Sequence, residues 1–183
     1  MKKSNALSLI GYALNIVKNQ FLAIVAAVLV TTIIGFFSSG GSLELLRFLI
    51  CFVVYLLLLY VNSWHQGSSD TNRVKLGKIP DNKFRGFLAG LIASIPGIVF
   101  AVLAFLSESG YVLFFEFMGQ DGIVVINRFI NFPLGVLYPL IEGKPALNIL
   151  FPLFSVIISG IAYILGRHYI SIKQIIIYKP DEK

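Results

Sequence analysis

The chain has 183 residues, of which 57% are hydrophobic and 13% charged, and its mean hydropathy is +0.84. Soluble domains are about 45–50% apolar and about 25% charged, and a globule of this size could not bury the excess apolar surface. The composition therefore excludes an ordinary soluble domain. The net charge of +6 does not indicate nucleic acid as a partner, because the basic residues stand at the ends of apolar runs.

The first twenty residues, MKKSNALSLIGYALNIVKNQ, place Leu7, Ile10, Leu14 and Val17 at helical spacing. This pattern predicts an amphipathic helix over residues 1–20 that lies on the inner leaflet, with its lysines near anionic headgroups. The alternative is that these residues extend the first membrane-spanning helix. A cleaved signal peptide is not expected, since the apolar run that follows begins late and is long.

Four apolar runs are long enough to cross a bilayer, which takes about 20 mainly apolar residues. They are residues 21–37, 45–61, 86–106 and 146–166, and the last two hold no charged residue. Pro96 predicts a kink in the third run. The sequence thus predicts an all-α fold, an integral membrane bundle of four transmembrane helices with the lipid bilayer around it.

The distribution of lysine and arginine predicts the orientation of this bundle. Twelve of these residues lie in the amino-terminal segment, in a loop at residues 63–85 and in a tail at residues 167–183. Only Arg47, Arg128 and Lys144 belong to the other side. The positive-inside rule therefore places both termini and the 63–85 loop in the cytoplasm.

Residues 107–145 are too apolar for a solvated loop. The stretch 123–141 is long enough for a fifth span, but such a span would move the basic tail to the outer side. We expect instead a hydrophobic outer cap between the third and fourth spans, made of interfacial or re-entrant helices broken at Pro133 and Pro139.

The long polar run is NSWHQGSSDTNRVKLGKIPDNKFRG, residues 62–86. His65 with Asp70 or Asp81 could ligate a metal or form an acid–base pair, and His168 is expected on the same side of the membrane. The spacing matches no known ligand set, so a histidine at headgroup level is the favoured interpretation.

Motifs of catalysis are absent from the sequence. It contains no H-E-x-x-H, G-x-S-x-G, C-x-x-C or S-x-x-K, and no charged residue or histidine lies in the middle of a predicted helix. We therefore expect no enzyme, and no catalytic residue, metal site or cofactor.

Small residues recur at one-turn spacing in the third and fourth spans, which lets helix backbones approach closely. Packing within the monomer is the favoured interpretation, and a subunit interface is the alternative. The candidate packing or partner face comprises Ala89, Ala93, Gly97, Ala101, Gly86, Gly90 and Ser94 together with Ser155 and Ser159.

The function that these observations favour is an accessory or interaction subunit of a membrane complex, with another membrane protein or a second copy as its partner. One alternative is a carrier or substrate-binding component for a neutral or lipid-like molecule, and another is immunity against a membrane-active peptide. Under the carrier hypothesis, an apolar pocket would be framed by Pro96, Phe132, Pro133, Tyr138, Pro139 and Pro152.

Two runs, GKIPDNKFRGFLAGLIASIPGIVFAVL and ISGIAYILGRHYISIKQIIIYK, resemble small multi-spanning membrane proteins of Gram-positive bacteria. That group has no assigned activity, so the resemblance transfers no functional residue. It implies location in a bacterial plasma membrane.

Overall fold

The computed structural model describes residues 2–37, 43–111, 116–117, 120–137 and 144–170. Its long helices are α1 (Lys2–Phe37), α2 (Glu44–Lys75), α3 (Arg85–Glu108) and α6 (Leu150–Arg167). Within the described part of the chain, four helices are long and apolar enough to cross a membrane. This confirms the prediction of a predominantly helical chain with four helices of membrane-spanning length.

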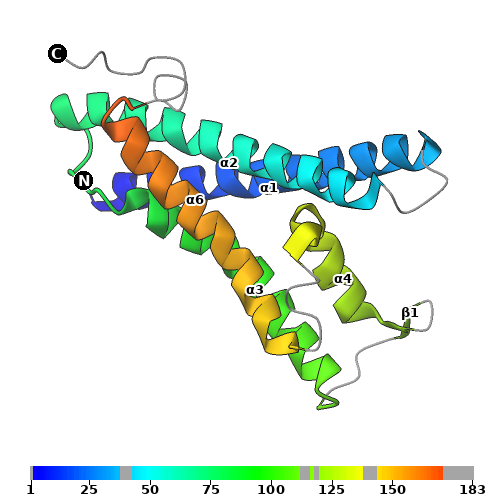
Figure 1. The fold of residues 1–183 in the computed structure, drawn as a ribbon. Coiled ribbons are helices and arrows are strands. Elements are labelled where there is room, and N and C mark those ends of the chain that lie inside the picture. Colours follow the sequence, from blue (N-terminus) through cyan, green and yellow to red (C-terminus); the bar gives the residue numbers. More distant parts are fainter. Residues whose placement is uncertain (1, 38–42, 112–115, 118–119, 138–143, 171–183) are drawn as a thin grey trace.

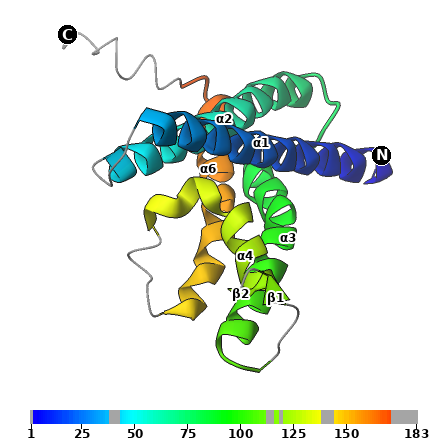
Figure 2. The same cartoon turned by 90° about the vertical axis from the view of Figure 1, so that its right-hand side faces the viewer.

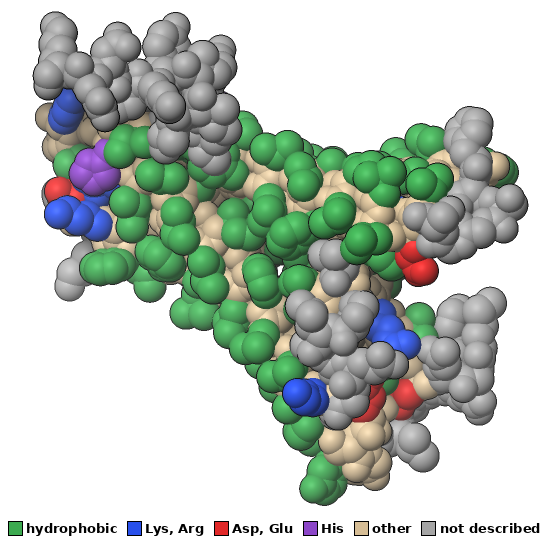
Figure 3. Space-filling model, viewed as in Figure 1, with side chains coloured by type: hydrophobic (Ala, Val, Ile, Leu, Met, Phe, Trp, Pro, Cys, Tyr) green, Lys and Arg blue, Asp and Glu red, His purple; other side chains and the backbone are tan. Residues whose placement is uncertain are grey.

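The long helices form two antiparallel pairs, α1 with α2 and α3 with α6, which meet at one end and diverge at the other (Figures 1 and 2). The amino ends of α1 and α3 meet the carboxyl ends of α2 and α6. We call this junction the basic end. The basic residues at this end include Arg73, Lys75, Lys78, Lys83, Arg85 and Arg167. On the face drawn in Figure 3, hydrophobic side chains cover most of the surface between the basic end and the diverging ends.

The first helix runs without a break from Lys2 to Phe37, so residues 1–20 do not form a separate interfacial helix. They extend the first membrane-spanning helix instead, which was the alternative interpretation. Ile10 and Leu14, from the predicted apolar stripe, are exposed, and the neighbouring face with Tyr12 and Ile16 is buried. The continuous helix follows from the sequence, because no proline interrupts the segment.

The predicted loop at 63–85 is wrong for its first half, because α2 continues to Lys75. Only residues 76–84 connect α2 to α3, with Gly77 at a φ of +65° and the Asn82 side chain accepting a hydrogen bond from the Phe84 amide. In the polar second half of α2, inward-facing residues recur at the same helical spacing as in the apolar first half. The buried stripe of α2 is Cys51, Tyr55, Leu59, Ser63, Gly67 and Asp70.

The small residues of α3 and α6 bring these two helices into close contact. A Cβ added at Gly90 would lie 2.8 Å from Val156 Cα, and one at Gly86 would overlap Tyr163. Every residue of the predicted packing face is buried except Gly97, which is half-buried. These rows of α3 and α6 therefore lie inside the chain.

The segment between α3 and α6 is not a single helix. It contains the short strands β1 (Glu116–Phe117) and β2 (Gln120–Asp121), the helix α4 (Gly122–Ile130), and the 3-10 helices η2 (Phe132–Leu137) and η3 (Pro145–Ile149). The strands pair antiparallel, and Asp121 caps α4 by accepting a hydrogen bond from the Ile123 amide.

The helical run that the sequence offered as a fifth span ends at Ile130, and Pro133 lies in η2. Pro139 lies outside the described residues. In space, α4 and η2 lie in the wedge between the diverging helix pairs (Figures 1 and 2), where α4 packs against α3 and η2 against α2. The wedge between the helix pairs is thus partly filled by α4 and η2.

Candidate functional site

A cavity of about 210 Å³ lies where the two helix pairs begin to diverge. For comparison, a buried apolar cavity of about 150 Å³ accommodates benzene. The cavity lies near the middle of both α1 and α3. Its lining consists of Val17, Gln20, Phe21 and Ile24 of α1, Tyr55 of α2, Ala93, Ser94, Pro96 and Gly97 of α3, Ile130, Asn131, Pro133 and Leu134 from the end of α4 and from η2, and Pro152 of α6.

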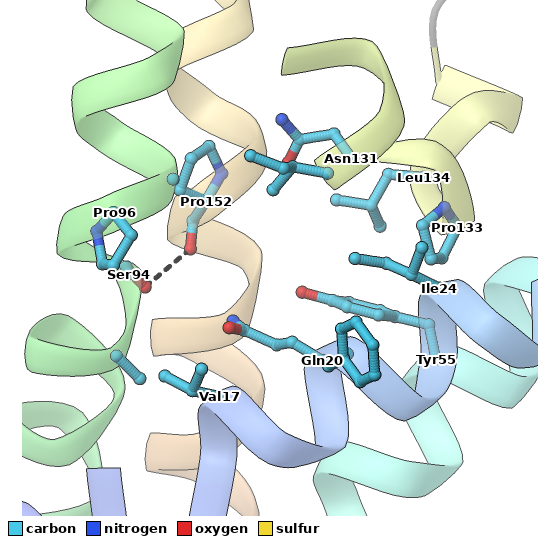
Figure 4. A pocket seen from close by; sticks show the side chains of 14 residues that line it. Val17, Gln20, Ile24, Tyr55, Ser94, Pro96, Asn131, Pro133, Leu134 and Pro152 are labelled. Atoms are coloured by element: carbon cyan, nitrogen blue, oxygen red, sulfur yellow. Dashed lines mark hydrogen bonds between the residues drawn. The ribbon is translucent and has the colours of Figure 1, made fainter. Parts of the chain in front are cut away.

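One wall of the cavity is the crossing of α3 and α6. A Cβ at Gly97 would lie 3.1 Å from Pro152 Cγ, so glycine allows this proline to approach closely. Pro96 has no amide hydrogen to donate within α3, which favours a bend at this level. The Ser94 hydroxyl contacts the Gly90 carbonyl at 2.7 Å and the Pro152 carbonyl at 2.9 Å (Figure 4). Pro96 and Pro152 thus form much of this wall, and the hydrogen bond from Ser94 to the Pro152 carbonyl stabilises it.

The lining is mainly apolar, but Gln20, Tyr55 and Asn131 bring polar groups to it. Figure 4 shows the Tyr55 hydroxyl and the Gln20 amide directed into the space, with Asn131 on the opposite side. No Asp, Glu, Lys, Arg or His occurs among the described residues of the lining. The cavity therefore suits a molecule that is uncharged and largely apolar.

The structure brings together part of the pocket that the sequence predicted. Pro96, Pro133 and Pro152 all line the cavity. Phe132 is half-buried and does not line it. Tyr138 and Pro139 lie outside the described residues. Sequence analysis missed the contribution of α1, because the lining residues of that helix carry no motif.

A second feature, the Asp70 cluster, lies inside the basic end. It comprises Asp70 and its partners Gln66, Arg73, Arg85 and Tyr163. The Asp70 carboxylate is fully buried and accepts hydrogen bonds from Gln66 Nε2 at 3.0 Å and from the Tyr163 hydroxyl at 3.1 Å. Arg85 Nε lies 3.2 Å from Asp70 Oδ2, and Arg73 Nη1 lies 3.7 Å from Oδ1. The cluster thus joins α2, α3 and α6.

Helix α1 reaches the same cluster through two side chains. Arg85 Nη2 donates a hydrogen bond of 2.6 Å to Ser8 Oγ, and the ring of Tyr12 stacks on that of Tyr163 with the centroids 6.0 Å apart. All four long helices are therefore fastened to one another at the basic end. Both oxygens of the Asp70 carboxylate are engaged in these contacts, so the carboxylate serves as a structural hydrogen-bond acceptor.

The histidines that the sequence offered as candidates do not join this cluster. His65 is exposed and forms an edge-on ring contact with Trp64. His168 is also exposed, and Asp81 pairs with Arg167 at 2.6 Å instead. Over the described ranges, no group of three or more His, Cys, Asp or Glu residues is placed to hold a metal ion.

Sequence analysis identified Asp70 only as a possible partner of His65. The missed signal was the spacing of Ser63, Gly67 and Asp70, which continues the inward stripe of α2 by steps of four and three residues. Comparisons with known proteins add no assignment, because no family model, curated protein or solved structure matches this chain.

Proposed function

We propose that this protein is a non-enzymatic, multi-pass membrane protein that binds a neutral, largely apolar molecule in the cavity between its two helix pairs, as a carrier or as a substrate-binding component. The observation that carries the proposal is the cavity itself, about 210 Å³ in volume and lined without any Asp, Glu, Lys, Arg or His among its described residues. Uncharged walls at mid-helix depth favour an uncharged ligand, because charge is costly at that depth.

The setting that we propose is a bacterial plasma membrane with the basic end on the cytoplasmic side. The support is the concentration of lysine and arginine at this end, including Arg73, Lys75 and Lys78. The diverging end carries acidic residues such as Glu44 and Glu108. In this orientation both termini are cytoplasmic.

The accessory-subunit hypothesis is less well supported by the structure. It assigned the docking role to the third and fourth spans and to the basic loop, but the small-residue faces of α3 and α6 pack on each other. Ser94 and Ser155, for example, are buried with their hydroxyl oxygens 2.7 Å apart. The exposed connection between α2 and α3, with Lys78 and Lys83, remains a candidate surface for a partner protein.

Native mass spectrometry of the protein, extracted gently from its host membrane, tests the binding function. We expect a reproducible small bound mass on the unmodified chain. Val17→Trp should remove that mass, because the indole would occupy the cavity. Val25→Trp is the matched control, since Val25 lies on the same helix, is exposed to a similar degree and does not line the cavity.

Two outcomes would contradict the proposal: an unmodified protein that carries no small mass, or a bound mass that persists in the Val17→Trp variant. A bound polypeptide in place of a small molecule would favour the accessory-subunit hypothesis instead.

A further inference from the structure

We propose that the molecule bound in the cavity is a neutral lipid alcohol, which enters sideways from the bilayer between α1 and α3 and places its hydroxyl among Gln20, Tyr55 and Asn131. This inference rests on the proposed binding function and goes further, because it names the chemical class of the ligand and its route.

The route follows from the exposure of the cavity rim. Phe21 of α1 is 62% exposed, and Pro96 of α3 is also exposed, although both line the cavity. The surface next to them is apolar, with Leu14 on α1 and Ile95 on α3 exposed. An opening bordered by such apolar residues gives access to lipid chains.

The polarity of the ligand follows from the hydrogen-bonding groups inside. The Asn131 amide nitrogen donates to the Asn127 backbone carbonyl at 3.0 Å and to Asn127 Oδ1 at 3.1 Å. The group that Asn131 offers to a ligand is therefore its oxygen, which is an acceptor. The Tyr55 hydroxyl offers a donor, and the Gln20 amide offers both functions.

A hydroxyl group satisfies this arrangement better than the alternatives. It can donate to Asn131 Oδ1 and accept from Tyr55 or Gln20, whereas a carbonyl can only accept and an alkyl chain can do neither. Polar groups of the protein that lose water without gaining a partner weaken binding, so the site should discriminate against a plain alkane.

The size of the cavity fits the polar end of such a molecule. A volume of about 210 Å³ is only moderately larger than the space that holds benzene, so a ten-carbon chain would extend through the rim beside Phe21. The ligand would thus keep most of its chain among lipid chains and bury its hydroxyl in the protein.

The test uses the purified full chain in a neutral detergent with three probes of equal chain length: 1-decanol, 2-decanone and n-decane. Binding is followed as the concentration-dependent shift of the thermal unfolding midpoint, from which Kd is obtained. The same titration of the Val17→Trp variant is subtracted, because it reports effects of the probes on the detergent. We expect 1-decanol to bind at least tenfold more tightly than n-decane, with 2-decanone between them.

Two conservative variants connect this preference to the named groups. Gln20→Leu and Tyr55→Phe keep side chains of similar size and should each lower the affinity for 1-decanol at least threefold while leaving n-decane binding unchanged. Asn15→Leu is the control, because Asn15 is an exposed residue of the same helix and does not line the cavity. The unfolding midpoint without probe shows whether each variant is folded.

The outcomes separate this inference from the proposed function. Equal affinity for 1-decanol and n-decane, or tighter binding of 2-decanone, would overturn the alcohol assignment and leave the binding function standing. No saturable binding of any probe beyond that of Val17→Trp would overturn both.

Discussion

The Asp70 carboxylate and the Arg85 guanidinium form an ion pair with 3.2 Å between Oδ2 and Nε, and both side chains are more than nine-tenths buried. Asp70 belongs to α2 and Arg85 to α3. Asp70 also accepts a hydrogen bond from Tyr163 of α6, and Arg85 also donates one to Ser8 of α1. Removing one partner of a buried pair leaves the other charge without compensation, and this is costly. The pair should therefore be among the most sensitive positions of the chain.

Asp70→Leu is expected to lower the free energy of unfolding by about 3–5 kcal/mol, because Arg85 would remain buried and unpaired. The double variant Asp70→Leu/Arg85→Leu should be less destabilised than Asp70→Leu alone. Thermal unfolding in detergent measures both effects. Glu44→Gln is the control, since it breaks an exposed pair with Arg47 and should change the stability by less than about 1 kcal/mol. Equal losses for Asp70→Leu and Glu44→Gln would contradict the burial of the pair.

Gly67→Ala should destabilise the contact of α2 with α6. A Cβ at this position would overlap the Tyr163 carbonyl oxygen, which is a backbone atom and cannot rotate away. We expect a loss of about 1–3 kcal/mol or more, as in other overpacked interiors. Gly11→Ala is the matched control, because nothing lies within 4 Å of a Cβ there and alanine is the better helix former. A stable Gly67→Ala variant would show that the two helices are further apart.

The hydroxyls of Ser94 and Ser155 should be energetically coupled, because their oxygens lie 2.7 Å apart in the buried interface of α3 and α6. A double-mutant cycle with Ser94→Ala and Ser155→Ala measures this coupling, which is typically about 0.6 kcal/mol for hydrogen bonds between membrane helices. The cycle of Ser94→Ala with Thr32→Ala is the control, since the Thr32 hydroxyl is exposed and bonds within its own helix. A coupling energy near zero for the serine pair would indicate that the helices do not meet as described.

In the topology that we propose, the connection between α2 and α3 and the end of α6 lie on the same side of the membrane. In a Cys51→Ala background, Lys78→Cys and His168→Cys should therefore react with an impermeant thiol reagent from the same side. Lys144→Cys, in the connection before η3, should react only from the opposite side. Labelling of all three positions from one side would rule out this membrane topology.

The sequence predicted the four long helices because their apolar runs are much longer than any strand or core helix requires. It also predicted the packing of α3 on α6, since rows such as Gly86 and Gly90 have few roles other than close helix contact. The carrier hypothesis grouped Pro96 with Pro133 and Pro152, because prolines in membrane helices often border binding cavities. Their common cavity depends on the way the two helix pairs diverge, which no local pattern encodes.

The polar part of α2 could not be predicted from composition. Gly67, Ser68 and Ser69 are typical of loops, and their intrinsic helix propensity is low. The helix forms there because Gly67 allows α6 to approach and because Asp70 finds partners on α3 and α6. Tertiary contacts thus override local preference. Only the spacing of the inward residues indicated this beforehand.

The contacts of the Asp70 cluster hold all four long helices together at the basic end, which can therefore act as a pivot. From Asp70 to Glu44, α2 is a rigid arm about 39 Å long, at 1.5 Å for each residue. A rotation of α2 by about 5° about Asp70 would displace Glu44, at the far end of the helix, by about 3 Å. It would displace Tyr55 by about 2 Å. Such a rotation would change the width of the gap between the helix pairs at the level of the cavity.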